Sequence, residues 1–563
     1  MQQDIAKIYI IPMKTSNLSI LPIRLGAIPI VDRYIETLKL EKLLEEVVPS
    51  DPRDKIPVWK TLSIILRNII LERHPLYKIG QWAHTRNLLS SSLCNCMTDD
   101  RIGRSLDRLF RSDRASLITK VILKAIDSFK VTIQKVHNDS TTVTLTGNYT
   151  NYRNGKSAQP QHGVNKDFRP DLRQLLFSLS VSGDEAIPLY FKVWDGNTTD
   201  DTTHLRNWMA LRNLLGTSDF IYVADSKLCV RETMLFIDTE GGSFITVLPE
   251  TRAEIDRFKQ WIQTNTPQWH QAIKKPNPRG RELPPHIFWT FDSPFSSSEG
   301  FRIVWVKSSQ KQLDDEQRRT RRIAACEEEL LSIAKKKHRN KEKLQKSVET
   351  VLNYYHTSRY FDWKITIFSE EQYKQTRRGR PDENTAYRKI CKEYYQLTWC
   401  QNPQAILFDT RYDGIFPLVS NNMHCKASDI LHSYKFQPRL EKRFEQLKTV
   451  YQVAPVFLKN PQRIESLLLL YFLALLITAL VERTVRKSMK EHGIGSIPIY
   501  PEERACKAPT ADKIPGLFDD IRLQYIMNGK EIVKSVEDNL SEIQKQVLWL
   551  VKIKPNDYFS GNC

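Results

Sequence analysis

Hydrophobic positions along the chain change their spacing several times, and each change predicts a change of structure. Over residues 58–83 apolar side chains recur at helical spacing with basic residues between them, which predicts a mostly helical region over 1–130. From about residue 131 the sequence becomes β-branched, and three strand-like runs follow up to residue 196. Residues 219–249 then show the order strand, turn, helix and strand, which indicates a mixed α/β domain.

Residues 251–403 interrupt this domain. Strand-like pieces flank a charged stretch from about 311 to 356, for which we expect a solvated helical hairpin, with direct DNA contact as the alternative. Strand character returns over 404–421 and helices are expected over 438–490. The pattern assigns no role to 491–563.

One apolar run resembles a membrane span. Ser466–Val481 holds 16 residues closed by Glu465 and Glu482, which is shorter than the roughly 18–20 residues needed to cross a bilayer. We therefore expect a buried core helix and no membrane; a basic membrane-associated protein is the alternative. Residues 1–14 lack the basic and apolar regions of a signal peptide.

Composition points to a polyanionic partner. The 563 residues carry 84 Lys and Arg against 65 Asp and Glu, a net charge of +19, which favours nucleic acid over an acidic membrane surface. The length predicts more than one domain. Nine cysteines without any Cys-x-x-Cys indicate reduced cytoplasmic thiols and neither a zinc site nor a disulfide framework.

Two aspartates occupy equivalent positions in the predicted strands. Asp139 lies in the strand-like "VHNDSTTV", and Asp225 closes the apolar run "FIYVAD". Carboxylates at strand ends point into the crevice where α/β sheets bind ligands, and Mg²⁺ prefers such oxygen ligands. A third carboxylate could complete a metal site. The alternative is that each aspartate only caps the following turn.

Glu441 is a candidate for that third carboxylate. Pro438 suits the first turn of a helix, which would carry Glu441 and Lys448 on one face; an ordinary exposed Glu–Lys face is the alternative. The neighbouring apolar stripe, which would pack on a sheet, consists of Leu440, Phe444 and Leu447.

The spacing Tyr434-x2-Gln437-x3-Glu441-x6-Lys448 resembles the Tyr-x2-Arg-x3-Glu-x6-Lys signature of one group of DDE transposases from bacterial insertion sequences. Gln437 replaces the usual Arg, so one charged contact to the DNA backbone is in doubt; Arg439 or Lys435 could replace it. The segments around both aspartates and the "YDGIFPLVSN" strand also resemble the group, in the same order. The likeness covers most of residues 20–485.

This resemblance implies a fold and a triad. The fold is an α/β, RNase H-like mixed-sheet catalytic core over 131–250 and 404–490. An insertion domain over 251–403 interrupts it, and a helical domain over 1–130 precedes it and binds the DNA end. The catalytic residues, which are also the metal ligands for two Mg²⁺ or Mn²⁺ ions, are Asp139, Asp225 and Glu441.

The implied activity is cut-and-paste DNA transposition. Hydrolysis at a transposon end precedes attack of the freed 3′-OH on the second strand, giving a hairpin end, and on target DNA. The residues expected to contact DNA are Tyr434, Lys448, Gln437 and Arg439. The partners are double-stranded terminal inverted repeats and target DNA, bound by a homodimer at the cytoplasmic nucleoid. Alternatives are a nuclease without strand transfer and an inactive, transposase-derived DNA-binding protein.

Two further side chains near these motifs have weaker cases. His137 could face the same side of its strand as Asp139, but Mg²⁺ prefers oxygen. Trp194, with Asn197 and Asp200 beyond it, could lie near DNA, where the aromatic ring of Trp194 could stack on a flipped base. Ordinary core packing is the alternative for Trp194 and also for Tyr434.

Overall fold

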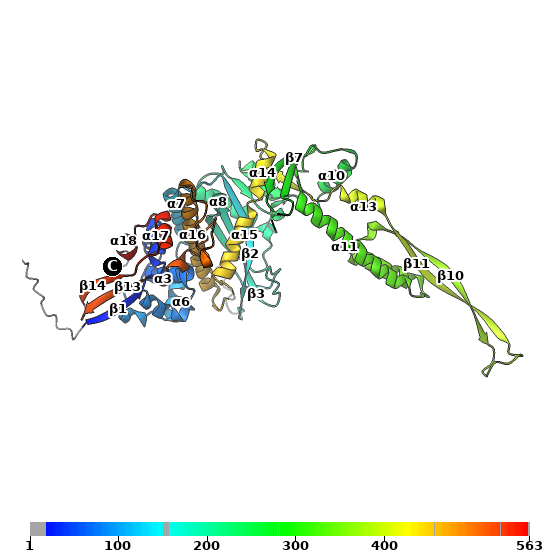
Figure 1. Ribbon diagram of the computed structural model, residues 1–563, viewed down its shortest axis with the longest axis horizontal. Helices are drawn as coiled ribbons and strands as arrows, with labels where there is room; N and C mark the ends of the chain where they lie inside the picture. Colours follow the sequence, from blue (N-terminus) through cyan, green and yellow to red (C-terminus); the bar gives the residue numbers. More distant parts are fainter. Residues whose placement is uncertain are drawn as a thin grey trace, which may run out of the picture. The chain divides into compact units, whose positions relative to one another are not determined.

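The computed structural model divides the chain into two compact units (Figure 1). Unit 1 comprises Met1–Phe244 and Ser433–Cys563, and unit 2 comprises Ile245–His432. The structure describes residues 18–560 except 148, 150–156, 278, 279, 281, 455 and 530. The segment 1–14, where we expect no signal peptide, lies outside these residues. The cysteines of the described part are all free thiols, as the sequence predicts.

Unit 1 contains a mixed sheet in the order β4-β3-β2-β5. Its strands are β2 (Lys135–Leu145), β3 (Arg173–Ser182), β4 (Pro188–Trp194) and β5 (Ile221–Val223). β3 runs antiparallel to both β2 and β4, whereas β5 runs parallel to β2. Together with the helices of this unit, the mixed sheet confirms the predicted α/β fold class; the RNase H-like assignment stays a prediction.

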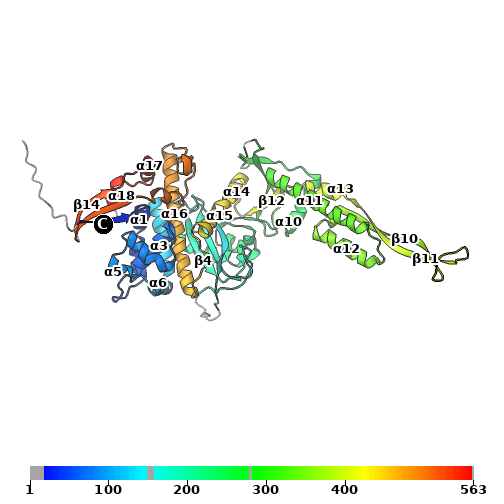
Figure 2. The ribbon, with the colours of Figure 1, turned by 60° about the horizontal axis from the view of Figure 1, so that its bottom comes forward.

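A long apolar helix, α16 (Pro461–Glu491), forms the centre of unit 1. It packs against β4 and against α3 (Val58–Leu71) and α6 (Asp99–Arg111) (Figure 2). By length and mean hydropathy, 2.4, α16 could cross a membrane, but 89% of that apolar window is buried inside the protein. The prediction of a buried core helix over Ser466–Val481 is therefore confirmed.

The two ends of the chain meet in unit 1. β1 (Leu18–Arg24) pairs antiparallel with β13 (Arg522–Asn528), which pairs with β14 (Glu531–Glu537). Residues 491–563, to which the sequence assigns no role, therefore complete the fold of the N-terminal region. The other helices at the two ends are α1 (Ile28–Thr37), α2 (Leu40–Val47), α4 (Ile79–Thr85), α5 (Ser91–Cys94), α7 (Arg114–Phe129), α17 (Glu542–Leu550) and α18 (Pro555–Ser560).

Unit 2 is built on antiparallel strands in the order β6-β12-β9-β8-β7. The strands are β6 (Ser243–Val247), β7 (His270–Lys275), β8 (His286–Asp292), β9 (Arg302–Ser308) and β12 (Ile415–Ser420). On them, the ring of Phe258 from α10 (Ala253–Thr264) stacks on Trp305 with centroids 3.7 Å apart. β12, which we expected in the second part of the core, groups with unit 2, because it pairs with β9 along its whole length.

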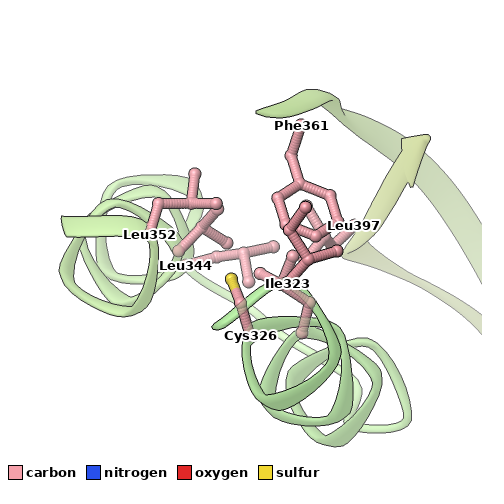
Figure 3. Close-up of a cluster of buried hydrophobic side chains, with 8 residues drawn as sticks. Ile323, Cys326, Leu344, Leu352, Phe361 and Leu397 are labelled. Carbon is pink, nitrogen blue, oxygen red and sulfur yellow. The ribbon is translucent and has the colours of Figure 1, made fainter. Parts of the chain in front are cut away.

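The charged stretch of unit 2 forms the predicted helical hairpin, α11 (Ser309–Ala334) and α12 (Lys341–Tyr354). α13 (Pro403–Thr410) follows later in the chain. The two hairpin helices pack on the base of a long β-ribbon made of β10 (Phe361–Gln375) and β11 (Tyr387–Gln401) (Figures 1 and 3). The buried cluster between helices and ribbon consists of Ile323, Cys326, Leu330, Leu344, Val348, Leu352, Phe361 and Leu397.

Candidate active site

The register between β2 and β5 places two aspartates beside each other. The parallel pairing sets Val136 opposite Tyr222 and His137 opposite Val223. Adjacent strands lie about 4.8 Å apart, and continuing this register brings Asp139 next to Asp225. Asp225 follows β5 and accepts a hydrogen bond from the Lys227 N–H at 3.0 Å, so the turn-capping role considered for it is present.

Asp139 lies in a cluster of charges. Burial raises the pKa of its carboxyl group to about 6; the Lys166 ammonium opposes this rise, and the negative charges of Asp225 and Asp200 add to it. The Lys166 Nζ is 3.9 Å from Asp139 Oδ1 and 3.2 Å from Asp200 Oδ2. Lys166 also donates to the Ser140 carbonyl at 2.7 Å, while the Ser140 hydroxyl donates to Asp200 at 2.5 Å.

Glu441 reaches this region on α15 (Gln437–Glu445). Pro438 lies in its first turn, and Leu440, Phe444 and Leu447 are buried, which confirms the predicted helix and its apolar stripe. The Gln437 side-chain amide donates to the Asn138 carbonyl at 3.3 Å. Because Asn138 directly precedes Asp139, this bond ties the start of the glutamate helix to the aspartate strand.

Tyr434, at the end of α14 (Ala427–Tyr434), is close to two of the three acids. Burial raises the pKa of its hydroxyl, and the negative charges of Asp225 and Glu441 raise it further. The tyrosine is half-buried. The carboxylates of Asp225 and Glu441 therefore both act electrostatically on the Tyr434 hydroxyl.

The three acids have the donor chemistry that Mg²⁺ prefers. Burial is the main cause of the raised pKa of Asp139, with smaller contributions from Asp225 and Asp200, and a bound cation would favour the charged carboxylate. Glu441 itself is exposed. Within the described residues, no group of three or more His, Cys, Asp or Glu is close enough to hold a metal ion together. The structure therefore brings the acids to one region without closing them into a finished metal site.

The residues expected to contact DNA have protein partners here. Lys448 lies in a π-helical turn, Gln446–Val450, and donates to Asp167 at 2.5 Å. Arg439 is half exposed and lies 3.1 Å from Glu185. The Gln437 side chain is uncharged and is hydrogen-bonded to the backbone of β2.

Two side chains considered near the motifs belong to the core. His137 is fully buried and stacks on Phe436, with ring centroids 4.6 Å apart; burial lowers its pKa to about 4, which keeps the ring neutral at physiological pH. Trp194 is buried and its indole N–H donates to Ser178 at 2.9 Å. Trp194 is therefore a core residue, which was the alternative interpretation, and its ring is not available to stack on a base.

Sequence reasoning missed two residues of the site. Lys166 lies in the sequence between the two aspartates and outside the motifs that the sequence analysis identified. His204 begins α8 (His204–Leu215), is buried, and has its Nε2 3.8 Å from Asp225 Oδ1. No sequence signal separates this histidine from an ordinary helix-start residue.

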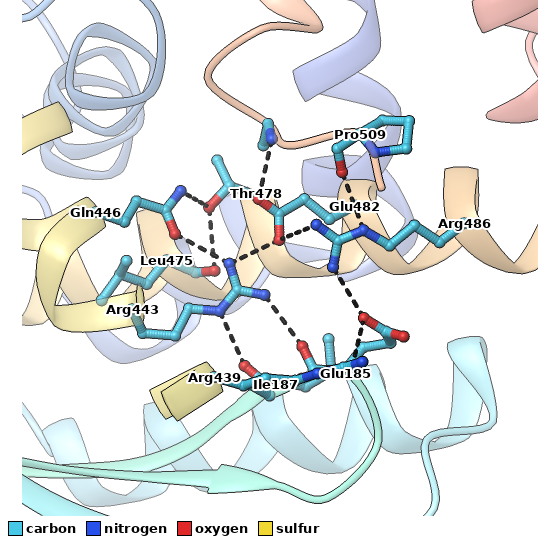
Figure 4. A network of polar contacts seen from close by, with 12 residues as sticks. Glu185, Ile187, Arg439, Arg443, Gln446, Leu475, Thr478, Glu482, Arg486 and Pro509 are labelled. Carbon is cyan, nitrogen blue, oxygen red and sulfur yellow. Dashed lines mark hydrogen bonds and ion pairs between the residues drawn. The ribbon is translucent and has the colours of Figure 1, made fainter. Parts of the chain in front are cut away.

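A buried ionic network holds α15 in place (Figure 4). Arg443 donates to the Ala186 and Glu185 carbonyls at 3.1 Å each and lies 2.8 Å from Glu482 of α16. Arg486, one turn after Glu482 on α16, forms ion pairs with both Glu482 and Glu185. The helix that carries Glu441 is thus fixed to the β3–β4 turn and to the central helix of unit 1.

Comparison with known proteins gives two likenesses. Residues 22–123 match the model of a family described as a domain of unknown function, DUF4277. No curated protein matches the chain. Among solved structures, the chain is similar to the cryo-EM structure of a piggyBac transposase synaptic complex with hairpin DNA, at 9% identity and a TM-score of 0.35, over 86% of this chain and 79% of that chain. The family match ends before Asp139 and so includes none of the site's acids.

Proposed function

We propose that the protein is a DNA transposase of the DDE type, which cleaves transposon ends and joins them to target DNA. The observation that supports the proposal is that the β2–β5 register, continued, sets Asp139 beside Asp225, while α15, which carries Glu441, is hydrogen-bonded to β2 through Gln437. The net charge of +19 suits a nucleic-acid substrate.

Asp139, Asp225 and Glu441 would hold Mg²⁺ or Mn²⁺, two ions in our proposal. Bound divalent ions of this kind lower the pKa of water and stabilise the leaving oxygen in phosphodiester cleavage. The chain's own groups do the rest. Lys448 and Arg439 supply positive charge for DNA phosphates, and the Tyr434 hydroxyl can donate to a phosphate oxygen. Gln437 positions α15 against β2.

The proposed partners follow from the reaction. The substrates are double-stranded terminal inverted repeats and target DNA, and a homodimer would pair two transposon ends. The proposed location is the cytoplasm, at the nucleoid.

The test is excision of a marker flanked by the element's own terminal repeats, with Mg²⁺ or Mn²⁺. We expect Glu441→Gln to abolish excision while DNA binding stays intact. Glu445→Gln is the matched control, because Glu445 is also exposed on α15. Equal activity of the two variants would refute the assignment of Glu441.

An inactive, transposase-derived DNA-binding protein is the second candidate. The observation in its favour is that the described acids are not close enough to form a metal group of three. It predicts end binding without cleavage in either metal. A nuclease without strand transfer would instead cleave ends and never join a 3′-OH to new DNA.

A further inference from the structure

The β10–β11 ribbon of unit 2 has two different halves. Its base is covered by α11 and α12, where Phe361 and Leu397 are buried. Farther out, the strands remain fully paired, from Ile367 opposite Tyr395 to Gln375 opposite Tyr387, yet their side chains are largely exposed. An isolated two-stranded ribbon is marginally stable in water, so the packed base of the ribbon must stabilise this outer half. Both faces of the outer half are exposed to solvent.

Charge is distributed unevenly along the ribbon. In the middle of the ribbon the acids have basic partners: Glu371 lies 2.5 Å from Lys389 of the facing strand, and Glu370 lies 2.7 Å from Lys337, between α11 and α12. The segment 374–389 around the tip carries six Lys or Arg and two acids. Three of these, Arg377, Arg378 and Arg380, are exposed in the connecting loop, and within the described residues none of them has an ion-pair partner.

Among the described residues, neither acid of the tip, Asp382 or Glu383, forms an ion pair with these arginines. The Asp382 carboxylate accepts hydrogen bonds from the Thr385 hydroxyl at 2.8 Å and from the Asn384 N–H at 3.1 Å. This aspartate therefore shapes the turn. The three guanidinium groups are left for an anion outside the chain.

We propose that the tip of the β10–β11 ribbon, residues 374–389, is a DNA-binding arm that enters the major groove of duplex DNA. Strands about 4.8 Å apart make a ribbon that fits a groove about 12 Å wide. The loop arginines then reach phosphates on the groove walls, with which guanidinium pairs in a bidentate manner. The arm gives the proposed transposase a DNA contact on a unit that holds none of its three acids.

The experiment measures the salt dependence of binding to a mixed-sequence DNA duplex. Each phosphate contact adds about 0.9 to the slope of log K against log salt. The triple variant Arg377→Gln, Arg378→Gln, Arg380→Gln should therefore reduce that slope by about two to three. Folding should be unaffected, because the three side chains are exposed.

The matched control removes the same charge from the same unit. Lys341, Lys343 and Lys346 are exposed on α12, and changing all three to Gln should leave the slope unchanged. An unchanged slope in the arginine variant, or an equal loss in both variants, would overturn the proposal. A changed sedimentation coefficient with an unchanged slope would assign the arm to a second copy of the chain and would also overturn it.

This inference rests on the proposed function for its biological meaning, but its test does not. Binding is measured without cleavage, so Glu441→Gln should keep the full slope. If the protein never cleaves DNA but shows the arginine-dependent slope, the proposed transposase activity would be refuted and the proposed DNA-binding arm would be supported.

Discussion

The ammonium group of Lys166 lies 3.9 Å from the carboxylate of Asp139. The same nitrogen is 3.2 Å from Asp200. The protein thus supplies its own cation to the aspartates of the candidate active site. A divalent ion held by Asp139 would have to share this space with a positive side chain, so Lys166 opposes metal binding in the arrangement seen here.

Replacing Lys166 by Met should tighten Mn²⁺ binding about fivefold. Two unit charges about 4 Å apart interact by about 1 kcal/mol in water, which corresponds to about fivefold in a binding constant. Lys166 is partly exposed, so solvent screening keeps its repulsion of a bound Mn²⁺ near this low value. Calorimetric titration with Mn²⁺ measures the change. Lys130→Met is the control, because Lys130 is exposed and pairs with Asp127, away from the three acids of the candidate active site. Weaker Mn²⁺ binding in the Lys166 variant would show that the lysine supports the site.

Replacing Arg443 by Met should lower the free energy of unfolding by about 3–5 kcal/mol, because it leaves Glu482 buried without its main partner. Urea denaturation measures the loss. Arg439→Met should cost less than about 1 kcal/mol, since that guanidinium is half exposed. Adding Glu482→Gln to the Arg443 variant should restore part of the loss; no recovery would mean that packing dominates.

Replacing Phe361 by Ala should destabilise unit 2 by about 3–5 kcal/mol, as removal of a buried aromatic ring usually does. Ile367, on the same strand, is 60% exposed, so Ile367→Ala should change stability by less than about 0.5 kcal/mol. Thermal or urea unfolding of both variants provides the comparison. Equal losses would indicate that the outer ribbon is also covered in solution.

The stability of unit 2 should depend on pH through Glu254. Burial alone would raise the pKa of this carboxyl group, but hydrogen bonds from Arg252 and from backbone N–H groups outweigh it and lower the pKa to about 2. The unfolded chain, with its ordinary value near 4.5, then binds more protons than the folded one below about pH 5. The contribution of Glu254 is therefore complete above that pH and is lost as pH falls towards 2.

Glu254→Gln tests this dependence. The stability difference between the natural protein and the variant should be largest above pH 5 and should shrink as pH approaches 2, measured by urea unfolding across the range. Asp256→Asn, on the same helix with an 80% exposed carboxylate, should show little pH dependence. A constant difference for Glu254→Gln would contradict the lowered pKa.

Elements that bury a regular apolar face could be predicted from the sequence. The β-branched runs became β2, β3 and β4, and the apolar stretch over Ser466–Val481 became the centre of α16. The charged hairpin of α11 and α12 was also predicted, since each helix keeps one apolar stripe. In these cases the pattern of a single segment determines its structure.

β11 and much of the site's polar detail could not be predicted in this way. The outer half of β11 buries almost nothing, so its residues do not alternate in polarity as a half-buried strand does. Lys166 and His204 meet the aspartates only through tertiary folding. Gln437 was expected to weaken a DNA contact, whereas it donates to the backbone beside Asp139, a role that no spacing encodes. The catalytic roles of the three acids stay predictions.

The pairing of β1 with β13 has a consequence during translation. Arg24 lies opposite Arg522, so the first strand emerges from the ribosome about 500 residues before its partner. At about 5–20 residues per second, that delay is roughly 25–100 seconds. Unit 2 can fold on the ribosome within this time, whereas the exposed apolar edge of β1, with Ile20 at 66% exposure even when folded, must wait for the end of synthesis. β1 therefore stays unpaired, and open to chaperone capture or aggregation, until β13 has been made.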